Sequence, residues 1–283
     1  MISLGLIGYP LKHSLSPIIH RAAFDYCGLD GTYSLYPILP SDLQGLSFLL
    51  EKIRNKEING LNVTIPHKQM VIPLLDELTT TAQNIGAVNT IFMKENKLIG
   101  DNTDAPGFLA HLYAFLGTEA EGSEAMKNAL VLGAGGAARA VTYSLIHDGW
   151  NVVLAARRIE QAQSLIDQFP DHQSHLTCID LHPDAFQSIA PDQRLVINAT
   201  PVGMFPNSDD SPWPNGVPFP PQAAFYDLVY NPRETKFVHN ARTAGLQAIT
   251  GMGMLVEQAA LAFEIWTGYY VPREPLLTAV EEK

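Results

Sequence analysis

Residues 129–138 read ALVLGAGGAA, an apolar run that leads directly into a glycine-rich turn. Gly133, Gly135 and Ala138 fit the pattern G-x-G-x-x-A, and a helical pattern follows over residues 137–148. The first glycine allows a tight turn, the second lets backbone amides approach a pyrophosphate, and the helix N-terminus adds partial positive charge. We therefore predict that a dinucleotide is bound by the residues of this turn, which are Gly133, Ala134, Gly135, Gly136 and Ala137. The alternative is a glycine-rich connection without a ligand.

The end of the next expected strand indicates which dinucleotide binds. A carboxylate about 20 residues after the glycines would read the ribose 2′-hydroxyl of NAD. Here the strand ends with the apolar residues 154–156 and is followed by Arg157 and Arg158, without an acid. Guanidinium groups match the oxygens of a 2′-phosphate and stay charged, so the pair favours NADP(H). The alternative is a solvated pair at a helix start, where the helix dipole mildly disfavours cations.

Strand-like and helix-like segments alternate on both sides of the glycine turn, which predicts an α/β fold. The expected strands lie at residues 2–7, 32–39, 60–65, 87–93, 97–99, 129–132, 152–156, 195–198 and 224–228. One helix is expected to begin with Ser16 as its N-cap and Pro17 as its first residue. Further helices are expected at residues 43–55, 66–77, 137–148, 160–169, 254–267 and 275–282. A polar stretch, Gly117 to Lys127, separates the two halves. The proline-rich residues 201–221 are expected to form a surface loop, because they lack a clean PxxP repeat.

The composition excludes several classes of partner. The chain of 283 residues, long enough for about two domains, has 18 Lys plus Arg against 29 Asp plus Glu and a net charge of −11. Such an acidic protein cannot neutralise phosphates over a broad surface, so neither nucleic acid nor a membrane is expected as a partner. Two cysteines, no signal-peptide pattern and no apolar stretch of about 18 residues favour a cytoplasmic location. We therefore expect small-molecule ligands that are held by a few placed groups.

Two residues are candidates for proton transfer. Lys68 lies in the first turn of the helix expected at 66–77, where the helix dipole destabilises an ammonium and favours proton exchange with a hydroxyl or carbonyl oxygen. Asp104 precedes a helical pattern and could orient both Lys68 and a substrate hydroxyl. The alternatives are that Lys68 is an exposed surface lysine and that Asp104 is a helix N-cap.

Ser14 and Ser16 offer two hydroxyls at a helix start. This arrangement suits a small carboxylate, and simple capping is the alternative. No cluster of His, Cys, Asp or Glu has the spacing of metal ligands, so no metal is expected.

Seven motifs, in order along almost the whole chain, resemble those of the shikimate dehydrogenase family. They are Ser14 to Pro17, Gly60 to Lys68, Gly86 to Thr90, Gly100 to Asp104, Gly133 to Arg139, Asn198 to Met204, and Gly251 to Gln258. Seven ordered motifs are far more specific than one glycine turn. The resemblance implies the reversible reduction of 3-dehydroshikimate to shikimate by NADPH, within chorismate and aromatic amino-acid biosynthesis.

The resemblance also implies individual roles. Lys68 is the acid/base, Asp104 is its partner, and Ser14 and Ser16 hold the substrate carboxylate. The remaining polar residues pair with ring hydroxyls or place the ring, since each hydroxyl needs a partner once water is excluded. They are Asn62, Thr64, Asn89, Tyr230 and Gln258. Leu228 and Gly251 are expected to border the nicotinamide.

The same resemblance implies two domains. Residues 1–105, joined by the C-terminal helical segment at about 255–283, form an α/β substrate-binding catalytic domain, and residues 106–254 form the NADP-binding Rossmann domain. The active site is then expected in the cleft between the domains. The family's common Asn-Arg-Thr after the second Rossmann strand reads Ala156-Arg157-Arg158 here, so the Asn contact is absent. The protein is expected to be a monomer or a homodimer.

Three other functions stay open. One is a quinate/shikimate dehydrogenase with dual cofactor use. Another is a non-catalytic NADP-binding regulator, although the presence of Lys68, Asp104 and Asn89 speaks against it. A Rossmann-like methyltransferase has a similar glycine turn, but Arg157 and Arg158 have no use in it.

Overall fold

The computed structural model describes residues 1–117 and 127–282, and these form two compact units. The first unit comprises Met1–Gly107 and Leu255–Lys283, and the second comprises Phe108–Met254. The sequence places the corresponding boundaries at 105/106 and about 255. The polar stretch expected at Gly117 to Lys127 lies, apart from its two end residues, outside the described residues. Within the described ranges, no helix has the length and apolar character that crossing a membrane requires.

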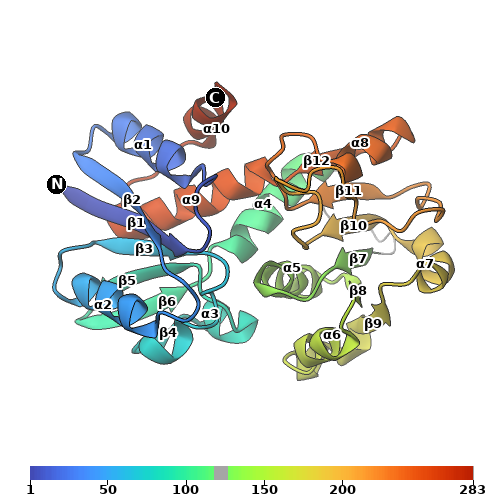
Figure 1. The fold of residues 1–283 in the computed structure, drawn as a ribbon, viewed down its shortest axis with the longest axis horizontal. Coiled ribbons are helices and arrows are strands. Elements are labelled where there is room, and N and C mark those ends of the chain that lie inside the picture. The colour runs from blue at the N-terminus through green and yellow to red at the C-terminus, as the bar shows by residue number, and fades with distance from the viewer. Residues whose placement is uncertain (118–126, 283) are drawn as a thin grey trace. The chain divides into compact units, whose positions relative to one another are not determined.

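The second unit is built around a parallel sheet (Figure 1). Its strands are β7 (Asn128–Leu132), β8 (Asn151–Ala156), β9 (Leu176–Asp180), β10 (Leu195–Asn198), β11 (Ala224–Asp227) and β12 (Ala248–Thr250). They pair in the order β12-β11-β10-β7-β8-β9, and every pair is parallel. With β7 as the first strand, this is the 3-2-1-4-5-6 order of dinucleotide-binding domains. The predicted Rossmann-type fold is therefore confirmed, and β9 and β12 are strands that the sequence pattern missed.

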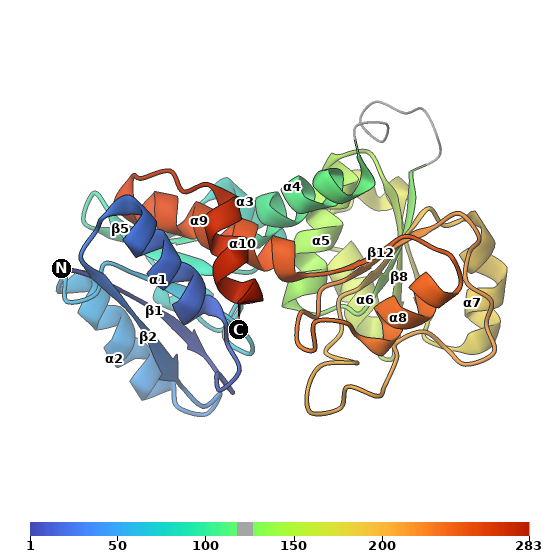
Figure 2. The ribbon, with the colours of Figure 1, turned by 90° about the horizontal axis from the view of Figure 1, so that it is seen from above.

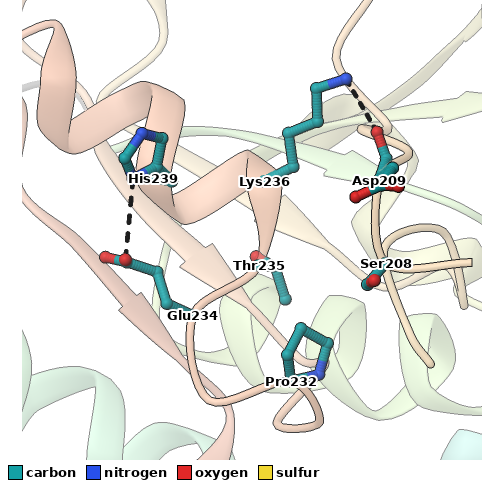
Figure 3. Close-up of a pocket in the computed structure, with 7 residues that line it drawn as sticks. All are labelled: Ser208, Asp209, Pro232, Glu234, Thr235, Lys236 and His239. Atoms are coloured by element: carbon teal, nitrogen blue, oxygen red, sulfur yellow. Dashed lines mark hydrogen bonds and ion pairs between the residues drawn. The ribbon is translucent and has the colours of Figure 1, made fainter. Parts of the chain in front are cut away.

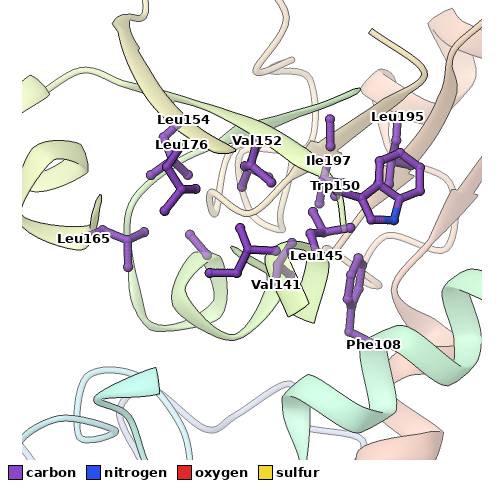
Figure 4. Packing of buried hydrophobic residues seen from close by; sticks show 14 of the residues in the cluster. Phe108, Val141, Leu145, Trp150, Val152, Leu154, Leu165, Leu176, Leu195 and Ile197 are labelled. Atoms are coloured by element: carbon purple, nitrogen blue, oxygen red, sulfur yellow. The ribbon is translucent and has the colours of Figure 1, made fainter. Parts of the chain in front are cut away.

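Helices cover both faces of this sheet, and Figure 2 shows α5 on one side of the strands and α7 on the other. These helices are α4 (Asp104–Leu116), which begins in the first unit, α5 (Gly136–His147), α6 (Ile159–Ile166), α7 (Pro183–Ile189) and α8 (Lys236–Thr243). Successive strand residues point to opposite faces. Val131 accordingly packs in the core that also contains Val141 of α5 and Leu165 of α6, whereas Leu132 packs in the core that contains Phe237 of α8. Figure 4 shows Val141 and Leu165 within the first of these cores.

The first unit contains a mixed sheet. Its strands are β1 (Ile2–Gly8), β2 (Gly31–Pro37), β3 (Gly60–Val63), β4 (Glu77–Leu78), β5 (Thr90–Lys94) and β6 (Lys97–Asp101), in the order β2-β1-β3-β5-β6-β4. β1 runs parallel to β2 and β3, whereas β5 runs antiparallel to both β3 and β6. The strand pair predicted around Glu95 and Asn96 is confirmed, and both residues have the positive φ that a two-residue hairpin turn requires.

Helices also cover both faces of the first sheet, and Figure 1 shows α1 and α2 on opposite sides of it. The helices of this unit are α1 (Ser16–Cys27), α2 (Leu43–Arg54), α3 (Thr80–Ile85), α9 (Met252–Thr267), which begins in the second unit, and α10 (Arg273–Glu281). Phe24 of α1 packs edge-to-face on Phe263 of α9, with 5.1 Å between ring centroids. Trp266 of α9 donates its indole N–H to the Ile91 carbonyl of β5 at 3.0 Å. The prediction that the C-terminal helix returns to this domain is therefore confirmed.

The helix predicted at residues 66–77 is wrong. Residues 65–71 form turns, and they are followed by a 3₁₀ turn at Ile72–Leu74 and by the short strand β4. Pro73 explains the difference, because proline has no N–H to donate to the carbonyl four residues earlier and its ring collides with that carbonyl. Lys68 therefore lies in a turn, without the helix dipole that the sequence argument invoked.

Two smaller expectations also change. α1 begins at Ser16, its N-cap is Leu15, and no side chain caps it, so the prediction of Ser16 as N-cap is wrong. Residues 201–221 are irregular as expected, yet Trp213 and Val217 are buried in the core that also contains Phe237. That segment is thus partly a core element and not a surface loop throughout.

Candidate active site

Polar side chains gather in the first unit where three of its strands lie side by side. The register pairs Asn62 of β3 with Thr90 of β5, and Thr90 with Asp101 of β6. Paired residues on neighbouring strands point to the same face of a sheet. Asn89 immediately precedes β5, and Asp104 follows β6 at the start of α4. The register therefore brings residues that are far apart in the sequence into one polar cluster.

Lys68 and Asp104 form the charged pair of this cluster. Lys68 Nζ donates to Asp104 Oδ2 at 2.5 Å, and the two side chains are only 15% and 8% exposed. The turn that carries Lys68 is held next to β5, because Val88 N–H donates to the Lys68 carbonyl at 2.8 Å. A buried carboxylate needs a partner for its charge, and the ammonium supplies one while its other N–H groups can still bond a ligand.

Asn89 holds the second oxygen of Asp104. Its Nδ2 donates to Asp104 Oδ1 at 2.8 Å and to Gln258 Oε1 at 3.3 Å, while its Oδ1 accepts from the Thr103 backbone N–H at 2.7 Å. Because a backbone N–H can only donate, the Thr103 contact fixes which end of the amide faces Asp104. Gln258 reaches the cluster from α9, whose backbone lies so close to α4 that a Cβ on Gly107 would lie 2.8 Å from the Gln258 nitrogen.

The first turn of α4 leaves the Asp104 carboxylate available for these contacts. Asn102 Oδ1 accepts from the Ala105 N–H at 3.2 Å, and Asn102 Nδ2 donates to the Ala87 carbonyl at 2.9 Å. Asn102 therefore provides the capping hydrogen bond that sequence position suggested for Asp104. The interpretation of Asp104 as the N-cap is wrong, since its carboxylate bonds Lys68 and Asn89 instead.

Ser14, Ser16 and Thr64 lie at one edge of the same sheet. β1 and β3 pair in parallel, the two serines follow β1, and Thr64 follows β3 directly. Ser14 Oγ accepts from the Ser16 backbone N–H at 3.2 Å. Across residues 1–117 and 127–282, none of these three side chains hydrogen-bonds to Lys68 or Asp104, so their hydroxyls are separate from the charged pair.

The glycine turn of the second unit has the shape that the motif predicts. Gly133 has a φ of +109°, a conformation that favours glycine, and its N–H donates to the Ala155 carbonyl at 2.8 Å. Gly135 is the N-cap of α5, and no neighbouring atom of the described residues lies within 4 Å of where its Cβ would be. Open space beside a helix N-terminus with unpaired backbone N–H groups suits a pyrophosphate.

Arg157 and Arg158 stand at the same edge of the second sheet as the glycine turn. They follow β8, which pairs in parallel with β7, the strand before the turn. Both are exposed, and neither makes an ion pair in the part of the chain that the structure describes. Two uncommitted guanidinium groups beside a pyrophosphate-binding turn fit the 2′-phosphate of NADP(H).

Three further predicted site residues also lie in the second unit. Leu228 follows β11 and Gly251 follows β12, and the chain is so close here that a Cβ on Gly251 would lie 2.5 Å from the Leu228 carbonyl oxygen. Only glycine fits at position 251 without a shift of the backbone. Tyr230 lies two residues after Leu228, and burial raises the pKa of its hydroxyl.

A buried carboxylate organises the ends of β10 and β11. Asp227 is fully buried and accepts hydrogen bonds from Thr235 Oγ1 at 2.6 Å, from Asn198 Nδ2 at 2.8 Å and from the Val229 N–H at 3.0 Å. Burial raises the pKa of Asp227 to about 6, although these hydrogen bonds act in the opposite direction. The network fixes the chain that leads from β11 to Leu228, beside Gly251.

A pocket of about 320 Å³ borders Thr235 but contains none of the predicted site residues (Figure 3). Two of its polar side chains already have partners: Lys236 Nζ donates to the Asp209 backbone carbonyl at 2.7 Å, and His239 Nδ1 lies 3.6 Å from a Glu234 carboxylate oxygen. We therefore assign it no ligand. Among the described residues, no group of three His, Cys, Asp or Glu side chains could hold a metal ion.

Sequence reasoning missed four residues that shape the polar cluster. Thr90, Asn102 and Thr103 stand inside motifs that were recognised, one or two positions from residues that were given roles. That proximity was the only available signal. Tyr33, which donates to Asn62 Oδ1 at 2.8 Å, gave no signal, because 29 residues separate the two and only the sheet brings them together.

The chain is similar to known proteins over almost its whole length. The family model described as shikimate dehydrogenase substrate binding domain matches residues 6–91, and that described as shikimate 5′-dehydrogenase C-terminal domain matches residues 251–281. The shikimate dehydrogenase (NADP(+)) of Methanopyrus kandleri is 40% identical over 281 residues, which cover 99% of this chain and 94% of that protein. The crystal structure of the Thermus thermophilus shikimate 5-dehydrogenase in complex with NADP(H) and shikimate is similar with a TM-score of 0.85 and 37% identity, covering 100% of this chain and 99% of that one. A quinate dehydrogenase from Corynebacterium glutamicum in complex with NAD is similar with a TM-score of 0.87 and 29% identity, covering 100% and 99% of the two chains.

Proposed function

The chain belongs to the shikimate dehydrogenase family, and we propose that it catalyses the reversible reduction of 3-dehydroshikimate to shikimate with NADPH, in chorismate and aromatic amino-acid biosynthesis. The observation that carries the proposal is the contact of Lys68 Nζ with Asp104 Oδ2 at 2.5 Å in a nearly buried polar cluster. An ammonium held by a carboxylate can give a proton to a neighbouring oxygen and take it back. The relatives named for this reaction, and the solved complex with NADP(H) and shikimate, support the choice of substrate and cofactor.

Lys68 is the acid/base of the proposed reaction. In the reductive direction, Lys68 Nζ gives a proton to the carbonyl oxygen of the substrate, which becomes a hydroxyl of shikimate. In the oxidative direction, the same nitrogen removes that proton. Asp104 holds the Lys68 ammonium through Oδ2, and Asn89 fixes the carboxylate through Oδ1. The pair is thereby oriented before a substrate arrives, which lowers the reorganisation that proton transfer requires.

The other polar residues of the first unit bind the substrate. Ser14 and Ser16, at the edge where β1 and β3 end, donate to its carboxylate. Ring hydroxyls pair with the remaining polar side chains, because a hydroxyl left unpaired in a site without water costs binding energy. These side chains are Asn62, Thr64, Asn89, Asp104 and Gln258.

The second unit fits NADP(H). The open turn from Gly133 to Ala137 and the N-terminus of α5 bind the pyrophosphate, Arg157 and Arg158 bind the 2′-phosphate, and Leu228 and Gly251 border the nicotinamide. When bound, the cofactor supplies or accepts the hydride at the carbon that carries the reacting oxygen. Residues 106–254 are accordingly the NADP-binding domain, and residues 1–105 with about 255–283 are the substrate-binding catalytic domain.

We also place the protein in the cytoplasm as a monomer or a homodimer. Cys27 and Cys178 are both free thiols, which suits a reducing compartment. Sedimentation of the purified protein decides between the two assembly states.

The absorbance of NADPH, followed with purified protein, shikimate and NADP⁺, tests the proposed function. We expect NADPH formation that depends on shikimate, with a higher kcat/KM for NADP⁺ than for NAD⁺. Comparable kcat/KM values for quinate and shikimate, with either cofactor, would instead support the dual-cofactor quinate/shikimate dehydrogenase. Tight NADPH binding without turnover of any cyclohexene acid would make the protein a non-catalytic NADP-binding regulator.

A further inference from the structure

A chain of hydrogen bonds crosses the sheet of the first unit, starting at its edge strand β2. The Tyr33 hydroxyl donates to Asn62 Oδ1 at 2.8 Å. Asn62 Nδ2 donates to Thr90 Oγ1 at 3.3 Å and to the Asn89 backbone carbonyl at 3.2 Å. A carbonyl can only accept, so the Asn62 amide cannot turn over without losing a bond. Its oxygen therefore faces Tyr33, and the Tyr33 phenol must be the donor in that contact.

The chain of hydrogen bonds continues from Thr90 to the acid/base pair. Thr90 Oγ1 donates to Asn89 Oδ1 at 2.9 Å, and Asn89 Nδ2 donates to Asp104 Oδ1 at 2.8 Å. Lys68 Nζ donates to the other oxygen of the same carboxylate. Every donor along the path, from Tyr33 onward, thus points toward Asp104.

Thr90 joins the two halves of this chain of hydrogen bonds, because its hydroxyl bonds both Asn62 and Asn89. Its side chain is fully buried, and its hydroxyl receives the Asn62 N–H while giving its own proton to Asn89 Oδ1. A valine at this position would fill the same space, but one buried Asn62 N–H would lose its acceptor, and Asn89 Oδ1 would keep only its hydrogen bonds from Thr103. A buried polar group that loses a partner costs free energy, so the Asn62 and Asn89 amides would shift to recover one.

The ring of Tyr33 is held by an aromatic partner. The rings of Tyr33 and His20 stack with 4.1 Å between their centroids and 8° between their planes. His20 is fully buried, and burial lowers its pKa to about 3, so it packs as a neutral ring. Removal of the Tyr33 hydroxyl alone would therefore leave the ring in place.

We propose that Thr90 and Tyr33 are positioning residues that act through Asn62 and Asn89 to fix Asp104 against Lys68. The inference rests on the proposed function and deepens it, because it assigns the orientation of the acid/base pair to residues that have no substrate or cofactor contact in the proposed function. Thr90 acts directly on Asn89, whereas Tyr33 acts through Asn62 and Thr90, so the effect of Thr90 must be the larger.

The test compares Thr90→Val, Thr90→Ser, Tyr33→Phe and, as a matched control on the same strand, Tyr36→Phe. The Tyr36 hydroxyl forms no hydrogen bond among the described residues. We expect kcat for shikimate oxidation to fall about ten-fold in Thr90→Val and about three-fold in Tyr33→Phe, as for loss of a buried hydrogen bond. Thr90→Ser and Tyr36→Phe should stay within about two-fold of the wild type, and KM for NADP⁺ should not change in any variant. The double variant Thr90→Val/Tyr33→Phe should match Thr90→Val alone, because the path from Tyr33 runs through Thr90.

A second readout does not depend on activity. The nitrogen-15 resonance of the Asn89 side-chain amide should shift in Thr90→Val and in Tyr33→Phe, and should stay unchanged in Tyr36→Phe. An unmoved Asn89 resonance, wild-type kcat in both variants, or multiplied effects in the double variant would overturn the inference. A wild type that does not oxidise shikimate, together with a shifted Asn89 resonance, would refute the proposed function and still support the positioning chain.

Discussion

Replacing Asp227 with asparagine should change how the stability of the protein depends on pH. Asp227 is fully buried at the end of β11, and burial raises its pKa from the ordinary 3.8 to about 6. Below both values the carboxyl is protonated in the folded and the unfolded chain, so the cost of burying its charge is absent. As the pH rises from 3.8 toward 6, the unfolded chain loses this proton while the folded protein keeps it. The contribution of Asp227 to the free energy of unfolding therefore falls through this window and levels off above it.

The magnitude follows from the difference between the two pKa values. About 2 pKa units correspond to about 3 kcal/mol in full. Between about pH 5 and pH 8, the contribution of Asp227 falls by about 1.4 kcal/mol, because part of the loss has already occurred at pH 5. Asparagine does not titrate, so the variant lacks this slope. Any difference caused by the amide itself is the same at every pH.

The assay is urea unfolding of the wild type, of Asp227→Asn and of Asp210→Asn, at several pH values across this range. Asp210 is an exposed aspartate of the same unit and serves as the matched control. We expect Asp227→Asn to gain about 1–2 kcal/mol relative to the wild type between about pH 5 and pH 8, and Asp210→Asn to gain nothing. A difference that stays constant with pH, or a wild type that gains relative to Asp227→Asn, would refute the reasoning.

Changing both Arg157 and Arg158 to alanine should raise KM for NADP⁺ by about ten-fold to a hundred-fold and leave KM for NAD⁺ within about two-fold, because charge-assisted bonds to the 2′-phosphate are lost; steady-state kinetics with both cofactors measures this, and equal losses would contradict it. Asn102→Ala should lower the free energy of unfolding by about 1–2 kcal/mol, since a helix cap and a buried carbonyl lose their partner; unchanged urea unfolding would count against that role. Gly251→Ala should cost about 1–3 kcal/mol, because the new Cβ would lie 2.5 Å from a backbone oxygen; thermal unfolding checks it, and a wild-type Tm would show that the backbone shifts freely.

The parts of the fold that the sequence predicted correctly are those with local signals. The apolar run before Gly133 and the helical pattern after it define β7 and α5 without any distant contact. β12 spans only Ala248–Thr250 and is too short to show a periodicity, so it was missed. The helix expected at 66–77 is absent because Pro73 lies inside that range, and its missing N–H decides the local structure.

The polar cluster could be predicted only in part for a related reason. Lys68 and Asp104 are individually ambiguous by position, and it was the set of seven motifs that singled them out. Their contact depends on the register of β3, β5 and β6, which no local pattern encodes. Asn102 could not be distinguished from Asp104 by the sequence either, because both residue types favour helix starts. In the structure Asn102 caps the helix, which leaves the Asp104 carboxylate free to bond Lys68 and Asn89.

The measurement that tests the central claim most directly is kcat for shikimate oxidation by Lys68→Met. Methionine keeps an unbranched side chain of similar length but cannot carry the proton that Lys68 Nζ exchanges with the substrate oxygen. The account predicts that kcat falls at least about a hundred-fold and that Kd for NADP⁺ stays close to that of the wild type, whereas Tm falls because the buried Asp104 carboxylate loses the partner for its charge. A folded Lys68→Met that keeps kcat within about ten-fold of the wild type would contradict it, because proton transfer would then not depend on this residue.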